Sequence, residues 1–473
     1  MTDYVGSIDY YHENALHRYG MNYPDGTQFA EELIFPDEDG KISTDRYISP
    51  TWLAAEIERV WKKTWQYVCR ADDIPDAGSF LTYTIADQEF LVVRQADGSV
   101  KALNNVCLHR GNMLRNGCGV TEDLKCRFHH WAWEIDGSLK DIPDRHCFVG
   151  LDDEDLSLGE VPCDTWAGFV FLNPDSTSPV LLRDFLGPIV DQLAPYHFEN
   201  MLTTTNVTQP LSCNWKTAIE AFLEAYHTMG LHPQLLPSLD DVNTTFEVMG
   251  DHSRMITPFG VPSMRYEEVD IRAILDSYTD TGGAIQGREL DPGDTPLHTG
   301  LRPSSEELAE TMRDADGMTV REWLMDYVRK EAGARGRPLD DMLPNQAIDD
   351  WHYFLFPGVV MNINPMSTLL LRMRPHATDP DSCWVDVCTY EWPHPERGPF
   401  KSRPNVVKAE GEVNYGKVLV QDFDNLPGVQ RGLHSDRLKH MLISKQEVRV
   451  TAFNRAVERY VGASHTSGLN KAT

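Results

Sequence analysis

The chain has 473 residues, of which 41% are hydrophobic and 24% are charged, a composition typical of a globular protein with two or three domains. Its formal net charge of −29 makes nucleic acids and anionic membranes unfavourable partners. Because no apolar run approaches the roughly 18–20 residues that span a bilayer, and no secretory signal is evident at the start of the chain, we expect a cytoplasmic protein with no membrane partner.

The first predicted segment is an arm, residues 1–59, that ends in a helix and packs on the larger C-terminal domain. Residues 51–70 carry apolar side chains at helical spacing. The pattern then changes to the alternation of strands at 79–85 and 89–94, and 164–173 is expected to be one closing strand. These strands predict a small all-β domain, which we place at residues 60–178.

Two short motifs of Cys and His lie inside this small domain. They read Cys107-Leu-His109 and Cys126-Arg-Phe-His129. Thiolate sulfur and imidazole nitrogen are ligands that proteins offer to iron and zinc. Zinc ribbons mostly use pairs of Cys, whereas in a Rieske [2Fe–2S] cluster two His replace two Cys on one iron. The Cys-x-His pair therefore favours the cluster over zinc, and unrelated core residues are the weakest explanation.

Residues 179–473 predict a second domain with a long antiparallel sheet and packed helices, so the fold class is α+β. A helix from 214 to 230 follows a strand at 206–213. Residues 265–345 are rich in Asp, Glu and Gly and fit either an insertion that covers a site or a solvated spacer. Long strands are expected at 351–375 and 382–392, and an amphipathic helix at 447–461.

His227 and His232 lie on the predicted helix and form a second candidate metal site. A His pair alone is weak evidence, but together with a later carboxylate it would make the facial triad that binds Fe(II) with open positions. Residues five apart are about 140° out of phase on an α-helix. For both to bind one ion, the helix must bulge or end between them, and we expect this at 229–231, beside Gly230 and Pro233.

These motifs together resemble the catalytic (alpha) subunit of the Rieske non-haem iron ring-hydroxylating oxygenases. The Cys/His motifs, followed by Trp131, Trp133 and an Asp-Gly turn, are similar to the family's Rieske domain, and the segment around His227 is similar to its catalytic helix. The chain departs from the family at His130, where Gly is usual, and at Ala221, where Asn is frequent.

The resemblance implies which side chains bind each metal. Cys107, His109, Cys126 and His129 would hold the [2Fe–2S] cluster. His227 and His232 would hold mononuclear Fe(II) with an acidic residue that precedes a Gln-Arg-Gly sequence. That residue is Asp422, and Asp424 is the second choice; for either, an acid that only stabilises a helix N-terminus is the simpler explanation.

Glu224 occupies the family position of an acidic residue that connects the two metals. In the family it joins an iron-ligand His of one subunit to a cluster-ligand His of the next, here His227 and His129. Many members have Asp at this position, and Glu is found chiefly in relatives that oxidise quaternary amines. A Glu on a solvated helix face is the alternative explanation.

The function that the resemblance implies is that of the oxygenase component of a Rieske system. It would use O2 and electrons from NAD(P)H, delivered by a reductase and possibly a ferredoxin, to hydroxylate an aromatic or polycyclic apolar substrate. The alternative is a monooxygenase or demethylase that acts on an amine, ether or alicyclic substrate. A homotrimer or an α3β3 assembly is expected. Candidate pocket residues are Phe222, Met229, Leu231 and Phe356, although for each of them a place in the plain core is the simpler explanation.

Overall fold

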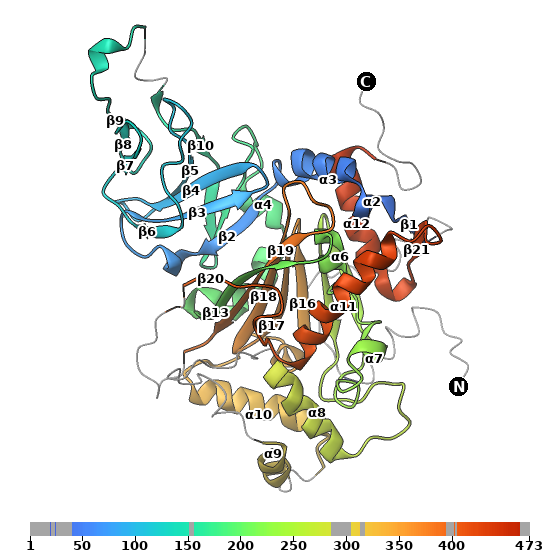
Figure 1. Cartoon of the computed structure of the whole chain (residues 1–473). Helices are drawn as coiled ribbons and strands as arrows, with labels where there is room; N and C mark the ends of the chain where they lie inside the picture. Colours follow the sequence, from blue (N-terminus) through green and yellow to red (C-terminus); the bar gives the residue numbers. More distant parts are fainter. Residues whose placement is uncertain are drawn as a thin grey trace. The chain divides into compact units, whose positions relative to one another are not determined.

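The computed structural model describes residues 19, 24, 40–150, 156–284, 304–312, 317–393, 402 and 404–463. The chain folds into two compact units, which we call the smaller unit (Ala54–Val190) and the larger unit (Met1–Leu53 with Asp191–Thr473) (Figure 1). Most of the predicted arm lies outside the described residues. Within the described ranges, no helix combines the length and the apolar character that crossing a bilayer requires.

The smaller unit is built mainly from antiparallel sheets. Its strands are β2 (Gln66–Arg70), β3 (Ser79–Ile85), β4 (Gln88–Arg94), β5 (Val100–Asn104), β6 (Cys118–Val120), β7 (Leu124–Lys125), β8 (Ala132–Trp133), β9 (Leu139–Asp141), β10 (Glu160–Val161), β11 (Cys163–Trp166) and β12 (Phe169–Leu172). They form sheets in the orders β10-β5-β4-β3-β6, β11-β12-β2 and β7-β8-β9. The unit extends beyond the predicted 60–178 at both ends.

In the smaller unit, one sequence prediction holds only in part and another is wrong. The helix expected at the end of the arm is present as α3 (Pro50–Glu56) and one π-helical turn (Ile57–Trp61), but the helical spacing noted over 51–70 does not continue as helix beyond Trp61. The next strand, β2, is buried throughout and pairs with β12, so sheet pairing overrides the apolar spacing. The single strand expected at 164–173 is a hairpin, because Ala167 and Gly168 both adopt positive φ and form a tight turn between β11 and β12.

The larger unit is built on one eight-stranded sheet. Its strands are β13 (Leu202–Leu211), β14 (Thr245–Met249), β15 (His252–Thr257), β16 (Asp350–Leu355), β17 (Val359–Asn364), β18 (Ser367–Pro375), β19 (Cys383–Glu391) and β20 (Val406–Val407). The order is β14-β15-β16-β17-β18-β19-β13-β20, and every pair is antiparallel except β13 with β20. The α+β architecture with a long antiparallel sheet is therefore confirmed.

The helices of the larger unit form two groups. One group is α6 (Trp215–Glu220), α11 (Lys417–Leu433) and α12 (Val448–Val461), which contact the sheet, and the one-turn α7 (Thr228–Leu231) follows α6 in the chain (Figure 1). The second group is α8 (Ile271–Ala284), α9 (Ser305–Met312) and α10 (Val320–Ala334).

The second helix group belongs to the segment 265–345, which sequence alone left open between an insertion over a site and a solvated spacer. Its helices share a buried apolar cluster with the chain that follows α7 and with the loop before β16. Leu275, Leu308 and Leu324 in this cluster are at most 1% exposed. The described part of the segment is therefore a packed layer rather than a spacer.

Candidate metal centres

The two Cys/His motifs of the smaller unit form two loops of similar construction. The first lies between β5 and β6, where the Cys107 carbonyl accepts a hydrogen bond from Gly111 N–H at 2.9 Å. The second lies between β7 and β8, where the Cys126 carbonyl accepts from His130 N–H at 3.1 Å. Both cysteines are buried in the unit's core beside Trp131. In each loop the cysteine is thus buried and the histidine is partly exposed.

The four side chains meet as two pairs, sulfur with sulfur and imidazole with imidazole. The Cys107 and Cys126 thiols interact, and burial raises the pKa of the Cys107 thiol. Cys126 Sγ also accepts from Phe128 N–H at 3.4 Å. The His109 and His129 rings lie 4.5 Å apart between centroids, and His109 Nδ1 is buried with no hydrogen-bond partner among the described residues.

This pairing fits a two-iron cluster better than one zinc ion. A single tetrahedral zinc needs all its ligand atoms close together. Across the part of the chain that the structure describes, no three of these four side chains bring ligand atoms within 4.8 Å of one another. In a Rieske cluster the Cys pair and the His pair bind different irons, so two separated pairs are what the cluster requires.

His130 explains how the chain departs from the family pattern at this loop. Its φ is +62°, in the left-handed region that favours glycine, and its side chain is exposed. The position needs Gly for its backbone rather than for close packing. Histidine therefore fits at the expense of some strain, with its ring directed to solvent and away from the buried sulfur atoms.

In the larger unit, the predicted helix over 214–230 ends early. Asn214 caps α6 by accepting from Lys216 N–H at 3.0 Å, but the helix stops at Glu220 and turns occupy the chain up to α7. The break therefore lies at 221–227 rather than at 229–231. Within it, the Glu224 carboxylate accepts from His227 N–H at 2.9 Å, and such local side-chain bonds compete with helical hydrogen bonds.

The early break brings the two histidines to one point with Asp422. His227 and His232 flank the single turn of α7, and their ligand atoms and one Asp422 oxygen all lie within 4.8 Å of one another. Asp422 Oδ1 is 2.9 Å from His232 Nε2 and 3.9 Å from His227 Nε2. Asp422 is buried inside α11, beyond its first turn, whereas Asp424 is exposed. Two nitrogens and a carboxylate oxygen are a donor set that suits Fe(II).

Second hydrogen bonds orient both imidazole rings towards this point. His227 Nδ1 donates to Glu224 Oε1 at 2.7 Å, and His232 Nδ1 donates to Gln421 Oε1 at 3.0 Å. With its proton on Nδ1, each ring directs the Nε2 lone pair at the common point. Sequence reasoning missed Gln421, whose place beside Asp422 on α11 was the available signal.

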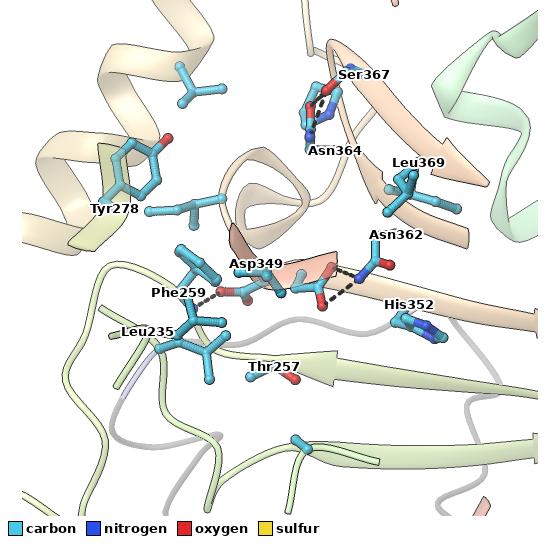
Figure 2. Close-up of a pocket in the computed structure, with 18 of the residues that line it drawn as sticks. Leu235, Thr257, Phe259, Tyr278, Asp349, His352, Asn362, Asn364, Ser367 and Leu369 are labelled. Atoms are coloured by element: carbon cyan, nitrogen blue, oxygen red, sulfur yellow. Dashed lines mark hydrogen bonds between the residues drawn. The ribbon is translucent and has the colours of Figure 1, made fainter. Parts of the chain in front are cut away.

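A cavity of about 290 Å³ adjoins the three side chains (Figure 2). Phe222 lines it as predicted, together with Phe259, Tyr278 and Tyr327. Of the other predicted pocket residues, none is in the lining: Met229 is 38% exposed, Leu231 is partly exposed, and Phe356 is in the core. Helices α8, α9 and α10 supply part of the wall.

Polar side chains occupy the wall that β16 and β17 provide. Burial raises the pKa of Asp350 to about 6, and its carboxylate accepts from Asn362 Nδ2 at 3.1 Å. Burial and the charge of Arg449 hold the pKa of His352 well below its usual range. The cavity is therefore apolar and aromatic on some walls and carries polar groups on the sheet side (Figure 2).

Comparison with family models gives two matches that together span most of the chain. Residues 64–162 match the Rieske [2Fe-2S] domain, and residues 198–463 match the ring hydroxylating alpha subunit (catalytic domain). The first match contains both Cys/His loops. The second contains the two histidines, Asp422 and the cavity.

Curated relatives include two oxygenase subunits. The chain is 34% identical over 223 residues to the glycine betaine monooxygenase oxygenase subunit of Chromohalobacter salexigens, covering 46% of this chain and 48% of that protein. It is 28% identical over 239 residues to the carnitine monooxygenase oxygenase subunit of Escherichia coli, covering 49% of this chain and 63% of that one. The matched region thus spans about half of the first relative and less than two thirds of the second.

Solved structures show the same fold. A quaternary ammonium Rieske monooxygenase in complex with L-carnitine superposes with a TM-score of 0.60 at 16% identity, covering 89% of this chain and 95% of that one. Naphthalene 1,2-dioxygenase with bound indole gives a TM-score of 0.60 at 17% identity, covering 90% and 93%. At these identities the likeness concerns the fold alone.

Proposed function

Because the chain belongs to the family of ring hydroxylating alpha subunits, we propose that it is the oxygenase component of a Rieske system that oxidises a small quaternary amine. The observation that carries this proposal is the convergence of His227, His232 and Asp422 beside an aromatic-walled cavity. Such a system uses electrons from NAD(P)H to place one atom of O2 in the substrate and to reduce the other to water. The amine alternative replaces the arene substrate that we expected first.

Two features of the cavity support a cationic amine over an apolar arene. Phe222, Phe259, Tyr278 and Tyr327 offer aromatic faces, which attract quaternary ammonium groups through their quadrupoles. Asp350 offers a carboxylate on the wall that the sheet provides. This carboxylate already accepts from Asn362, and a cationic substrate would add a charge partner that an apolar arene cannot supply. The relatives named for glycine betaine and carnitine fit the same substrate class.

The metal-binding roles follow from the donor sets. Cys107, His109, Cys126 and His129 would hold the [2Fe–2S] cluster, and His227, His232 and Asp422 would hold the mononuclear iron. Glu224 and Gln421 orient the two iron-binding imidazoles without reaching the metal themselves. Aromatic side chains and the packed layer of α8, α9 and α10 form part of the cavity wall and would limit the access of water to a bound substrate.

The assembly and its redox partners complete the proposal. A reductase, with or without a ferredoxin, would reduce the cluster from NAD(P)H. The subunits would form a homotrimer or an α3β3 complex in which Glu224 contacts His129 of the partner subunit.

The test of this function is turnover of defined substrates by the purified protein with a reductase and NADH. Glycine betaine, choline and carnitine should each be compared with naphthalene for substrate-dependent O2 uptake and oxidised product. We expect product from at least one quaternary amine and none from naphthalene. Oxidation of naphthalene with no amine turnover would contradict the proposal.

The exposed cations of the cluster loops predict how the electron donor binds. Arg110 and Arg127 are exposed on the two loops, and Lys125 is exposed at the end of β7, next to the second loop. Arg115 differs, because its guanidinium donates to the Lys125 carbonyl at 2.9 Å and to Thr121 Oγ1 at 2.9 Å and so holds the loop together. A local positive surface on a chain of net charge −29 can orient an acidic donor.

We therefore expect the double variant Lys125→Glu and Arg127→Glu to slow cluster reduction by about tenfold at low salt. Stopped-flow bleaching of the cluster absorbance measures this rate. Added salt should slow the wild type more than the variant. The matched control is Arg183→Glu, an exposed arginine on α4 (Leu182–Leu186), outside the cluster loops. This docking surface would be ruled out if Arg183→Glu slowed cluster reduction as much as the double variant does. It would also be ruled out if the reduction rate depended neither on these charges nor on the salt concentration.

A further inference from the structure

Three polar side chains form a small group on the sheet wall of the cavity. Asp350 and His352 are two residues apart on β16, so both point to the same face of the sheet. Asn362 is the register partner of His352 on β17. All three line the cavity, and Figure 2 shows His352 and Asn362 on the same side of it.

The protonation state of His352 follows from its contact with Arg449. Both terminal nitrogens of the Arg449 guanidinium lie 3.2 Å from His352 Nδ1. Arginine can only donate, so Nδ1 must be the unprotonated acceptor and the neutral ring carries its proton on Nε2. Arg449 is fully buried on α12 and also donates to Ser253 Oγ at 2.9 Å, which fixes its position.

The Nε2–H group of His352 is therefore a donor that the protein leaves unused. His352 is 1% exposed, and its Nε2 is buried with no hydrogen-bond partner among the described residues. Buried donors are nearly always paired, because leaving one unpaired costs its full desolvation energy. A donor without a protein partner at the wall of a substrate cavity points to a partner on the substrate.

Asp350 gives independent evidence of the substrate's charge. Its carboxylate accepts from Asn362 Nδ2. The positive charge of Arg449 also acts on it, but among the described residues no ion pair joins Asp350 to a Lys, Arg or His side chain. The guanidinium of Arg321, which also approaches this region, pairs with the neighbouring Asp349 instead. A carboxylate that lines a cavity and has no ion-pair partner among the described residues is suited to a cation in the cavity.

We propose that His352 and Asp350 are specificity-determining residues that bind opposite ends of the substrate. The His352 Nε2–H donates to an oxygen atom, and the Asp350 carboxylate faces the cationic nitrogen. The ligand is a small trialkylammonium compound that also carries a carboxylate or hydroxyl oxygen. The spacing of its nitrogen and oxygen should suit two side chains that leave the strand about 6–7 Å apart. This inference rests on the proposed function and narrows it.

The first test compares ligands that differ only in the oxygen. Calorimetry on the holoenzyme should give the dissociation constants of glycine betaine, choline and propyltrimethylammonium, which has no oxygen. For His352→Phe, we expect binding of the oxygen-bearing ligand preferred by the wild type to weaken about tenfold, with propyltrimethylammonium changed less than about twofold. His352→Gln, whose amide is again a donor, should recover most of the loss. Glycine betaine and choline distinguish a carboxylate from a hydroxyl.

The second test concerns the charge. Asp350→Asn keeps the size and the contact with Asn362 but removes the charge, so it should weaken all three cationic ligands by about tenfold. Asp424→Asn makes the same change at an exposed residue of α11 and should alter none of them. Circular dichroism of each variant checks that it folds.

The outcomes separate this inference from the proposed function. An equal loss for ligands with and without oxygen in His352→Phe, an absence of any loss, or a wild type that binds none of these ligands would overturn the inference. Binding that depends on His352 and Asp350 as described, but without turnover, would leave the inference standing and contradict the proposed oxidation. Turnover of an amine by the wild type, together with unchanged ligand binding in His352→Phe and Asp350→Asn, would support the proposed function and overturn the inference.

Discussion

Replacing Asp422 with alanine should remove the mononuclear iron and abolish turnover while the [2Fe–2S] cluster stays loaded. Asp422 Oδ1 lies 2.9 Å from His232 Nε2, the residue is 3% exposed, and it supplies the only carboxylate in the group of ligand atoms found among the described residues. Two imidazoles alone bind Fe(II) weakly compared with the two-His, one-carboxylate set. The cluster motifs lie in the other compact unit, which this change does not alter.

Iron analysis should show about two iron atoms per chain in this variant instead of about three, with the cluster's visible absorbance and reduced EPR signal unchanged. The matched control is Asp424→Ala, since Asp424 lies on the same helix, α11, but is exposed. It should keep its iron and its turnover. Iron lost in Asp424→Ala and kept in Asp422→Ala would transfer the ligand role to Asp424.

The fold could be predicted from sequence where local pattern and burial agree. The alternation at 79–85 matches β3, and the amphipathic period at 447–461 matches α12 to within one residue. Prediction failed where the secondary structure of a segment depends on a partner that is distant in the sequence. β2 continues an apolar helical pattern but becomes a strand, because β12 offers buried hydrogen bonds to it. No property of residues 66–70 alone contains that information.

The candidate site likewise has features that the local sequence predicts and features that depend on distant residues. The spacing of His227 and His232 required a break in the helix, and the break exists, but its position depends on the turn that the Glu224 carboxylate stabilises. The sequence analysis did not single out His352, because no residue near it in the chain indicates its contact with Arg449, which belongs to the last helix, α12. A signal was present nevertheless: Asp350 and His352 interrupt an otherwise apolar, buried strand at alternate positions.

Glu224→Gln should leave both metal centres loaded but lower turnover by about 100-fold, the upper range for a residue that orients a metal ligand. The Glu224 carboxylate accepts from His227 Nδ1 at 2.7 Å and from His227 N–H at 2.9 Å, and the side chain is 8% exposed. In the proposed assembly it also accepts from His129 of the partner subunit and so connects cluster to iron. Glutamine keeps the size, but its single neutral oxygen cannot accept these bonds as strongly as a carboxylate.

Three measurements on this variant separate electron transfer from metal binding. Iron content should equal that of the wild type, and the donor should reduce the cluster at the normal rate. Single-turnover product formation from the pre-reduced protein should be slow, because electrons no longer cross efficiently to the iron. Glu224→Asp should be milder, since it keeps the charge and loses only reach. Normal single-turnover rates in Glu224→Gln would show that electrons pass by another route, and loss of iron would show that the residue mainly holds His227 in place.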